Sequence, residues 1–242
     1  MRYFISALAI VALSAVDGFV NHQNNNIRQY SSSSLQAQTS SKLFDSEGWK
    51  PIKSGLDQVP VFTVATKEGH PLAYTIDIQG KQYNAPCFYC NVADSLAELE
   101  GAKEQNTEME GLDIVPFPLG QAFEMWSKDE AVIVPSKEAI LQAGAPPGTN
   151  PIGQQVPLFA CMEIMEEGES GDAVLPVFMS LDDANAAVRE AVATDGGDVN
   201  DFDVACLSLV GCVEQLATVP ETPAFHFIPP SSSMKYIQEY LS

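Results

Sequence analysis

The chain repeats part of its own sequence, and this repeat constrains its fold more than any other feature. Residues 58–62, QVPVF, return as residues 155–159, QVPLF. Residues 85–88, APCF, correspond to residues 175–178, LPVF, at an offset of 90. Further matches join LDIV at 112–115 to FDVA at 202–205, and Leu119 to Leu209. Three phrases in the same order predict one structural unit written twice.

The first copy shows the patterns of a small sheet followed by a helix. Runs of β-branched and aromatic residues, separated by glycine-containing turns, predict strands over 59–66, 72–78 and 83–89. Asn91 can then cap a helix over 92–105, where apolar residues recur at helical spacing. This copy therefore predicts a mainly antiparallel sheet covered by helices.

The second copy repeats this order with a shorter hairpin. Ser180 can cap a helix over 181–193, with Asp183 in the capping-box position. A terminal helix over 231–241 matches the helix that ends the first copy. We therefore predict an α+β fold of two similar halves, each a small, mainly antiparallel sheet with helices packed on it.

The boundaries follow from composition. The breaker-rich run GAPPGTNPIG at residues 144–153 predicts a linker. The first repeat then covers residues 43–143 and the second covers residues 154–242, which we call the first half and the second half.

The first 42 residues have the pattern of a leader with two parts. Residues 1–18 carry a basic residue followed by an apolar run too short to span a bilayer, which is typical of a secretory signal peptide. Residues 19–42 are rich in Asn, Gln and Ser and contain no acid, which is typical of a plastid transit peptide. Together they are similar to the bipartite leaders of algae with complex plastids, and we expect both to be absent from the mature protein.

The net charge of −20 narrows the range of partners. Residues 43–242 contain nine basic and 31 acidic residues, so their net charge is −22. This sign disfavours nucleic acid and anionic lipid surfaces, and we expect at most a peripheral contact with a membrane. It favours basic partners through electrostatic steering, and it equally serves solubility.

One motif offers redox chemistry. Cys87 and Cys90 form a C-x-x-C run at a strand-to-helix junction, where a helix N-terminus can stabilise a thiolate. In the repeat, however, the corresponding positions are Val177 and Ser180, which indicates a core position and a helix cap. A dithiol oxidoreductase therefore stays an alternative reading.

Other chemistry has little support. After removal of the leader the histidines are His70 and His226, which lie in different halves and away from any cysteine. The sequence contains no G-x-S-x-G, phosphate-binding glycine loop or H-E-x-x-H motif. We predict no catalytic residues, metal or cofactor, and a protein that is not an enzyme.

Apolar side chains remain as candidates for binding. Phe117, Phe123, Met125 and Trp126 follow one another at the end of the fourth strand of the first half. Met and aromatic side chains adapt to varied partners, so these residues form a candidate preprotein-binding surface. The alternative is that they pack the two halves together.

The repeated phrases resemble those of the 22-kDa Tic family. The resemblance is carried by the Val-Pro-x-Phe strand that opens each half, by the later Pro-x-Phe strand before a helix, and by the strand Ile114, Val115, Pro116 that ends in Leu119. Members are soluble proteins of the chloroplast intermembrane space that assist preprotein import.

The resemblance implies a pseudo-twofold molecule with apolar grooves and no catalytic centre. It further implies a chaperone-like holder of unfolded preproteins in the plastid envelope intermembrane space, whose partners are preproteins, transit peptides and envelope translocon components. The acidic body would draw in basic transit peptides. An accessory subunit of a plastid membrane complex is a further alternative.

Overall fold

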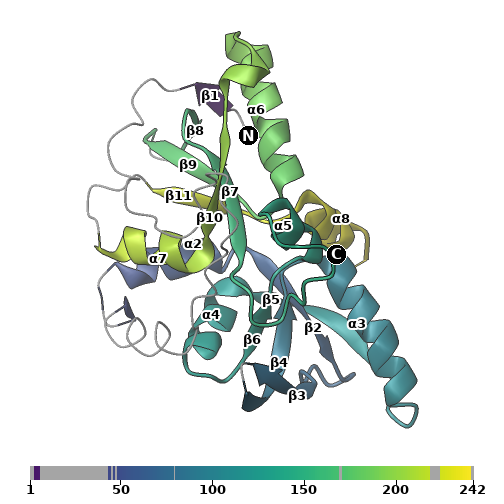
Figure 1. The fold of residues 1–242 in the computed structure, drawn as a ribbon. Helices are drawn as coiled ribbons and strands as arrows, with labels where there is room; N and C mark the ends of the chain where they lie inside the picture. The colour runs from purple at the N-terminus through teal and green to yellow at the C-terminus, as the bar shows by residue number, and fades with distance from the viewer. Residues whose placement is uncertain are drawn as a thin grey trace.

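The computed structural model describes residues 3–5, 43–44, 46, 48–78, 80–168, 171–218 and 224–240. The predicted transit peptide and most of the predicted signal peptide lie outside these ranges. The described chain forms two mainly antiparallel sheets flanked by helices (Figure 1). The predicted α+β class with two similar halves is therefore confirmed.

The first half contains a five-stranded sheet in the order β3-β4-β2-β5, with β6 parallel to the end of β4. Its strands are β2 (Pro60–Ala65), β3 (Ala73–Ile78), β4 (Lys81–Tyr89), β5 (Asp113–Pro118) and β6 (Val132–Val134). Its helices are α2 (Trp49–Leu56), α3 (Val92–Gln105), α4 (Leu119–Ser127) and α5 (Lys137–Gln142). Asn91 caps α3, as the sequence predicts, by accepting a hydrogen bond from the backbone N–H of Ala93.

The second half repeats this topology in a six-stranded sheet in the order β1-β8-β9-β7-β10, with β11 parallel to β9. Its strands are β7 (Pro157–Cys161), β8 (Ile164–Glu167), β9 (Ala173–Phe178), β10 (Val204–Ser208) and β11 (Phe225–Ile228), with β1 (Tyr3–Ile5) added at the edge. Its helices are α6 (Leu181–Asp195), the 3₁₀ turn η1 (Val199–Asp201), α7 (Leu209–Thr218) and α8 (Ser231–Tyr240).

The same backbone hydrogen bond recurs in the two halves. The N–H of Leu119 donates to the carbonyl of Val59 at 2.9 Å, and the N–H of Leu209 donates to the carbonyl of Val156 at 2.9 Å. Each bond fixes the start of a helix beside the start of the first strand of its half. The repeat seen in the sequence is thus a repeat of structure.

A second recurring bond corrects the predicted alignment by one residue. The N–H of Cys90 donates to the carbonyl of Val134, and the N–H of Met179 donates in the same way to Ile228. Cys90 therefore matches Met179, whereas we predicted a match to Ser180. A one-residue slip exchanges the two faces of a strand, and the shared Pro-x-Phe letters concealed this slip.

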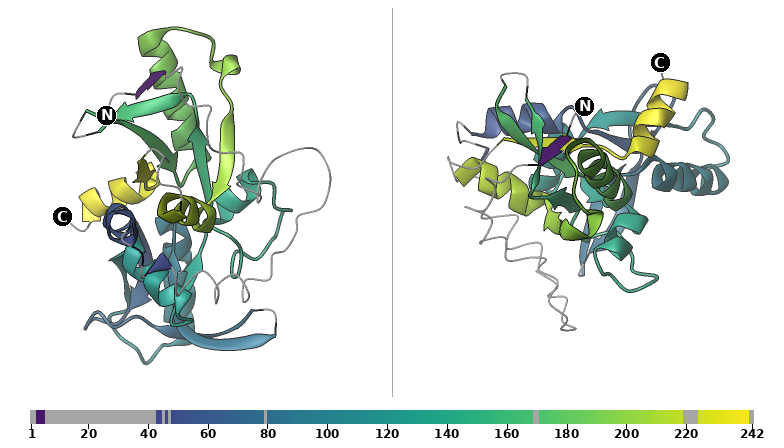
Figure 2. Two further views of the ribbon diagram at one scale, coloured as in Figure 1. Left: turned by 90° about the vertical axis from the view of Figure 1, so that its left-hand side faces the viewer. Right: turned by 90° about the horizontal axis from the view of Figure 1, so that it is seen from above.

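One core joins the halves. The inner faces of both sheets, together with α2, α4 and α7, contribute to a single cluster of buried apolar side chains. Trp49 and Leu56 of α2 are buried in it beside Phe123 of α4 and Val213 of α7. Figure 2 shows α2 and α7 between the two sheets. Burial of this apolar surface is the main stabilising contribution to the contact between the halves.

The outer faces of the sheets are covered by exchanged helices. From the second half, α8 packs on the first: Tyr236 meets the ring of Phe62 edge-on at 6.4 Å. From the first half, Ala139 of α5 is buried with Phe159 and Phe178 of the second sheet. Each half therefore completes the core of the other.

An aspartate in each half fixes the position of an exchanged helix. Oδ2 of Asp94, in α3, accepts a hydrogen bond from the N–H of Lys137 at the start of α5. Asp183 of α6 accepts from the backbone N–H and the hydroxyl of Ser231, at 2.9 and 2.7 Å, at the start of α8. Half of the predicted capping box forms, because Ser180 accepts from the N–H of Asp183. The Asp183 carboxylate itself caps a different helix.

We expect Asp183→Ala to lower the free energy of unfolding by about 1 kcal/mol, because the first turn of α8 loses its side-chain acceptor. Urea unfolding followed by circular dichroism measures the change. Asp182→Ala, in the same turn of α6, is the matched control and should cost about 0.3 kcal/mol through the helix dipole alone. Equal losses in the two variants would contradict the capping role.

Candidate functional site

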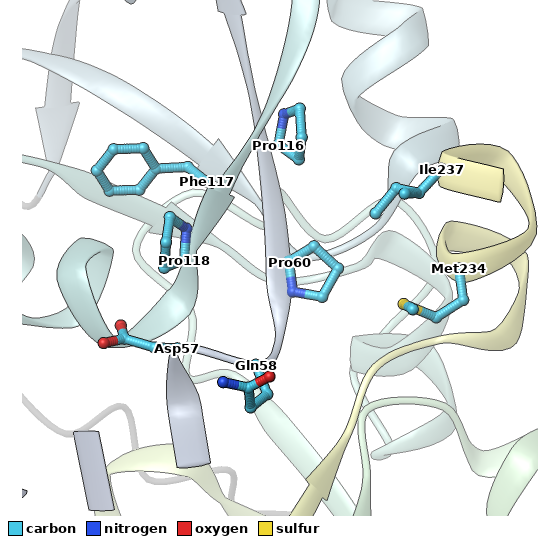
Figure 3. Close-up of a pocket in the computed structure, with 8 residues that line it drawn as sticks. All are labelled: Asp57, Gln58, Pro60, Pro116, Phe117, Pro118, Met234 and Ile237. Atoms are coloured by element: carbon cyan, nitrogen blue, oxygen red, sulfur yellow. The ribbon is translucent and has the colours of Figure 1, made fainter. Parts of the chain in front are cut away.

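An apolar groove lies where α8 of the second half crosses the first sheet. Its volume is about 260 Å³. We call it the α8 groove, and it is lined by Asp57, Gln58, Pro60, Pro116, Phe117, Pro118, Met234 and Ile237. Figure 3 shows Met234 and Ile237 projecting from α8 toward Pro60 and Pro116. The groove is apolar along its length and polar at the end formed by Asp57 and Gln58.

The sequence of β5 explains why this edge of the sheet stays open. Pro116 and Pro118 lie opposite Phe62 and Pro60 in the antiparallel register. Proline has no N–H to donate, and prolines on an edge strand discourage pairing with a further strand. The surface therefore offers apolar contact without a continuous row of backbone donors.

The polar end of the groove is held by close packing of α2 against α4. Lys53 forms an ion pair with Asp57 within α2 and its following turn. Gly120 of α4 permits this approach, because a Cβ there would lie 2.9 Å from the carbonyl oxygen of Lys53. A larger side chain at position 120 would displace Asp57, which lines the groove.

The predicted surface residues are divided by the structure. Phe117 is half-buried, and its ring stacks on Phe88 with centroids 4.7 Å apart. Figure 3 shows this ring pointing away from Met234 and Ile237. Phe117 thus contributes one side of the groove while its ring packs against the core.

The other predicted residues lie on α4. Phe123 is 2% exposed and belongs to the core, so it adds nothing to the surface. Trp126 is half-buried against Phe123, with ring centroids 5.2 Å apart, and Met125 is also half-buried. Met125 and Trp126 remain a proposed apolar contact surface, separate from the residues that line the α8 groove.

Sequence patterns missed the α8 side of the groove. Met234 is 36% exposed, and it lies more than 100 residues from Pro116 along the chain. The periodicity of α8 marks it as amphipathic but does not say which sheet it covers. The exchange of terminal helices brings these segments together.

The two cysteines of the C-x-x-C run lie in different environments. Cys87 packs in a cluster with Tyr89 and Val132, whereas Cys90 belongs to the core shared by the halves. Both thiols are free and buried. Burial raises the pKa of Cys87 to about 12, and burial raises the pKa of Cys90 as well. This is opposite to the lowered pKa that activates a redox dithiol, so the geometry does not favour the redox alternative.

The described part of the chain contains neither a candidate metal site nor a candidate membrane-spanning helix. It contains no group of three or more His, Cys, Asp or Glu side chains placed to hold a metal ion. None of its helices combines the length and apolarity needed to cross a bilayer. His226 instead pairs with the buried carboxylate of Glu166.

Thiol labelling tests the burial of the cysteines. Because the thiolate is the reacting form, a pKa of about 12 leaves Cys87 with about a thousandfold less thiolate at pH 8 than an ordinary cysteine. We expect an aromatic disulfide reagent to label the half-buried Cys206 first and Cys87 and Cys90 only on unfolding. The denatured protein, in which all five thiols should react alike, is the control. Rapid labelling of Cys87 and Cys90 in the native protein would contradict this result.

The fold is similar to that of two solved structures. Anabaena Tic22, a protein of protein transport, shares 20% sequence identity with this chain over 78% of this chain and 96% of its own, with a TM-score of 0.59. Tic22 from Plasmodium falciparum shares 20% identity over 77% of this chain and 96% of its own, with a TM-score of 0.62. No family model matches the sequence, and no curated protein matches it significantly. The chain therefore has a Tic22-like fold, as its resemblance to the 22-kDa Tic family predicted.

Proposed function

We propose that this chain is a non-enzymatic plastid protein import factor that holds unfolded preproteins as they cross the envelope. The observation that carries the proposal is the fold, which matches a protein-transport protein over 96% of that protein's length. The plastid-type leader supports the same role. On these grounds the proposed location is the envelope intermembrane space.

The proposed holding surface is apolar and shallow. The α8 groove offers Met234, Ile237 and two edge prolines, and α4 adds half-buried Met125 and Trp126. Such a surface suits many weak contacts with varied sequences better than one deep pocket would. Affinity then comes from the number of contacts that a flexible preprotein makes.

The proposed steering is electrostatic. Transit peptides are basic and poor in acid, and residues 43–242 carry a net charge of −22. An excess of one charge raises the rate of encounter with an oppositely charged chain, and salt screens this effect over about 10 Å at 0.1 M. Apolar contact would then retain the preprotein after encounter.

Crosslinking in isolated plastids arrested during import tests the holding role. A photoreactive amino acid at position 126 or position 234 would replace a half-buried or exposed apolar side chain. Crosslinks to several unrelated precursors are expected. One abundant fixed partner would instead favour an accessory subunit of a membrane complex, and the absence of crosslinks at both positions would overturn the proposal.

Binding of a fluorescent transit peptide separates the two contributions. We expect the affinity to fall between low and high salt without vanishing, because screening removes the steering and leaves the apolar contact. Binding that is independent of salt would remove the electrostatic part of the proposal.

The apolar part is tested at one residue of the groove. Met234→Gln should weaken binding about tenfold, since the partly exposed thioether loses its apolar contact with the peptide. Lys235→Gln, at the neighbouring position of α8, is the control, and its side chain is 75% exposed. Because Lys235→Gln removes a positive charge, the binding of a basic peptide should be unchanged or slightly stronger. Equal affinity of Met234→Gln and the unchanged protein would exclude the α8 groove.

A further inference from the structure

The edge of β8 holds a short strand from the start of the chain. Strand β1 pairs antiparallel with β8, so that Tyr3 lies opposite Glu166 and Ile5 lies opposite Ile164. Figure 1 shows β1 beside β8, next to α6. If the first 42 residues are removed, as their sequence predicts, this edge loses its partner.

The side chain of Tyr3 packs against residues from several elements. Its ring is half-buried and lies 6.1 Å from the ring of Phe178. It also packs against the apolar clusters under α6, which include Ala187 and Val188. Strand β1 fills this place, between the outer edge of β8 and α6, and we call it the β8 groove. Its walls fit an aromatic side chain on an extended strand.

A buried carboxylate faces the same place. Glu166 is 6% exposed, and its Oε2 pairs with Nδ1 of His226. Its Oε1 is buried and has no hydrogen-bond partner among the described residues. A buried acceptor without a partner costs free energy, so Glu166 favours a strand that brings a hydrogen-bond donor or a positive charge.

The surroundings extend this preference. Burial first, then the charges of Glu166 and Glu190, a side-chain hydrogen bond with Glu166 and the charge of Asp183 raise the pKa of Tyr3. All three groups are acidic, and they lie on β8 and α6, the two elements that bound the groove. An acidic strand would be repelled, whereas a neutral or basic strand would be accepted.

We propose that the β8 groove binds an extended, acid-poor segment of a preprotein by strand addition, with an aromatic or donor-bearing side chain at the position that Tyr3 occupies. The identity of this partner rests on the function proposed above. Residues 3–5 are then an internal occupant that closes the groove until the leader is removed. Main-chain pairing supplies affinity that depends little on sequence, which suits a protein with many clients.

Two sheet edges of the molecule differ in this respect. Strand β5, at one edge of the first sheet, carries Pro116 and Pro118, which cannot donate to an added strand. Strand β8, with the sequence IMEE, has no proline and already pairs on its outer side. The proposal therefore assigns extended pairing to the second half and apolar side-chain contact to the α8 groove of the first half.

The full chain tests the proposal with a fluorescent synthetic peptide of residues 1–8. In the unchanged chain, β1 competes at an effective concentration in the millimolar range, so the peptide binds weakly. In Tyr3→Asp, the new carboxylate is repelled by Glu166 and β1 leaves the groove. We expect this variant to bind the peptide at least about tenfold more tightly, because the internal competitor is lost. Asn26→Asp adds the same charge elsewhere in the leader and should bind like the unchanged chain.

Two further measurements locate the binding. A peptide with a benzophenone side chain in place of Tyr should crosslink to residues of β8 or α6 in the Tyr3→Asp chain. Tyr3→Gly, which removes the ring without adding charge, should show the same gain if Tyr3→Asp does not fold. Equal peptide affinity in the released and unchanged chains, or crosslinks confined to other elements, would overturn the proposal.

These outcomes are independent of the import experiment. Peptide binding decides the β8 groove, and precursor crosslinking at positions 126 and 234 decides the holding role. Failure of one leaves the result of the other unchanged.

Discussion

Each of the two sheets has two apolar faces, and the rest of the structure depends on how these four faces are covered. The inner faces cover each other, with α2, α4 and α7 between them. The outer faces need helices, and each receives one from its own half and one from the other. Because α3 and α6 are each too narrow to cover a sheet alone, the exchange of α5 and α8 completes both outer layers. The α8 groove exists because α8 crosses the edge of a sheet to which it is not joined in sequence.

Much of this could be predicted from the sequence, because the repeat carries the topology. The order of strands and helices and the caps Asn91 and Ser180 follow from local patterns. The sequence alignment matches Cys90 to Ser180, one residue away from its structural counterpart Met179. Identical residues in the two copies of a repeat need not lie on the same face of a strand. A structural repeat is therefore better aligned on its caps than on its prolines.

The candidate site was less predictable, for a physical reason. Amphipathic helices show which of their faces is apolar, but the choice of the surface that they cover is made by the whole fold. Phe123 and Trp126 look alike in sequence, yet one is in the core and the other is half-buried. Met234 and Ile237 line the α8 groove because α8 packs on the sheet of the other half. The hydrophobic periodicity of α8 does not reveal this packing. The edge at β8 was equally hidden, because its partner lies in the predicted leader.

The helix exchange also orders the events of synthesis. Synthesis produces the first half first, but the backbone N–H of Val92 donates to the buried hydroxyl of Ser233, which lies 141 residues later in the chain. The ring of Phe62 likewise lacks its contact with the ring of Tyr236 until α8 has been synthesised. The first half therefore stays incomplete until α8, which begins at Ser231, has been synthesised. A chain that is synthesised or translocated from its N-terminus thus leaves part of its first sheet uncovered until α8 has followed.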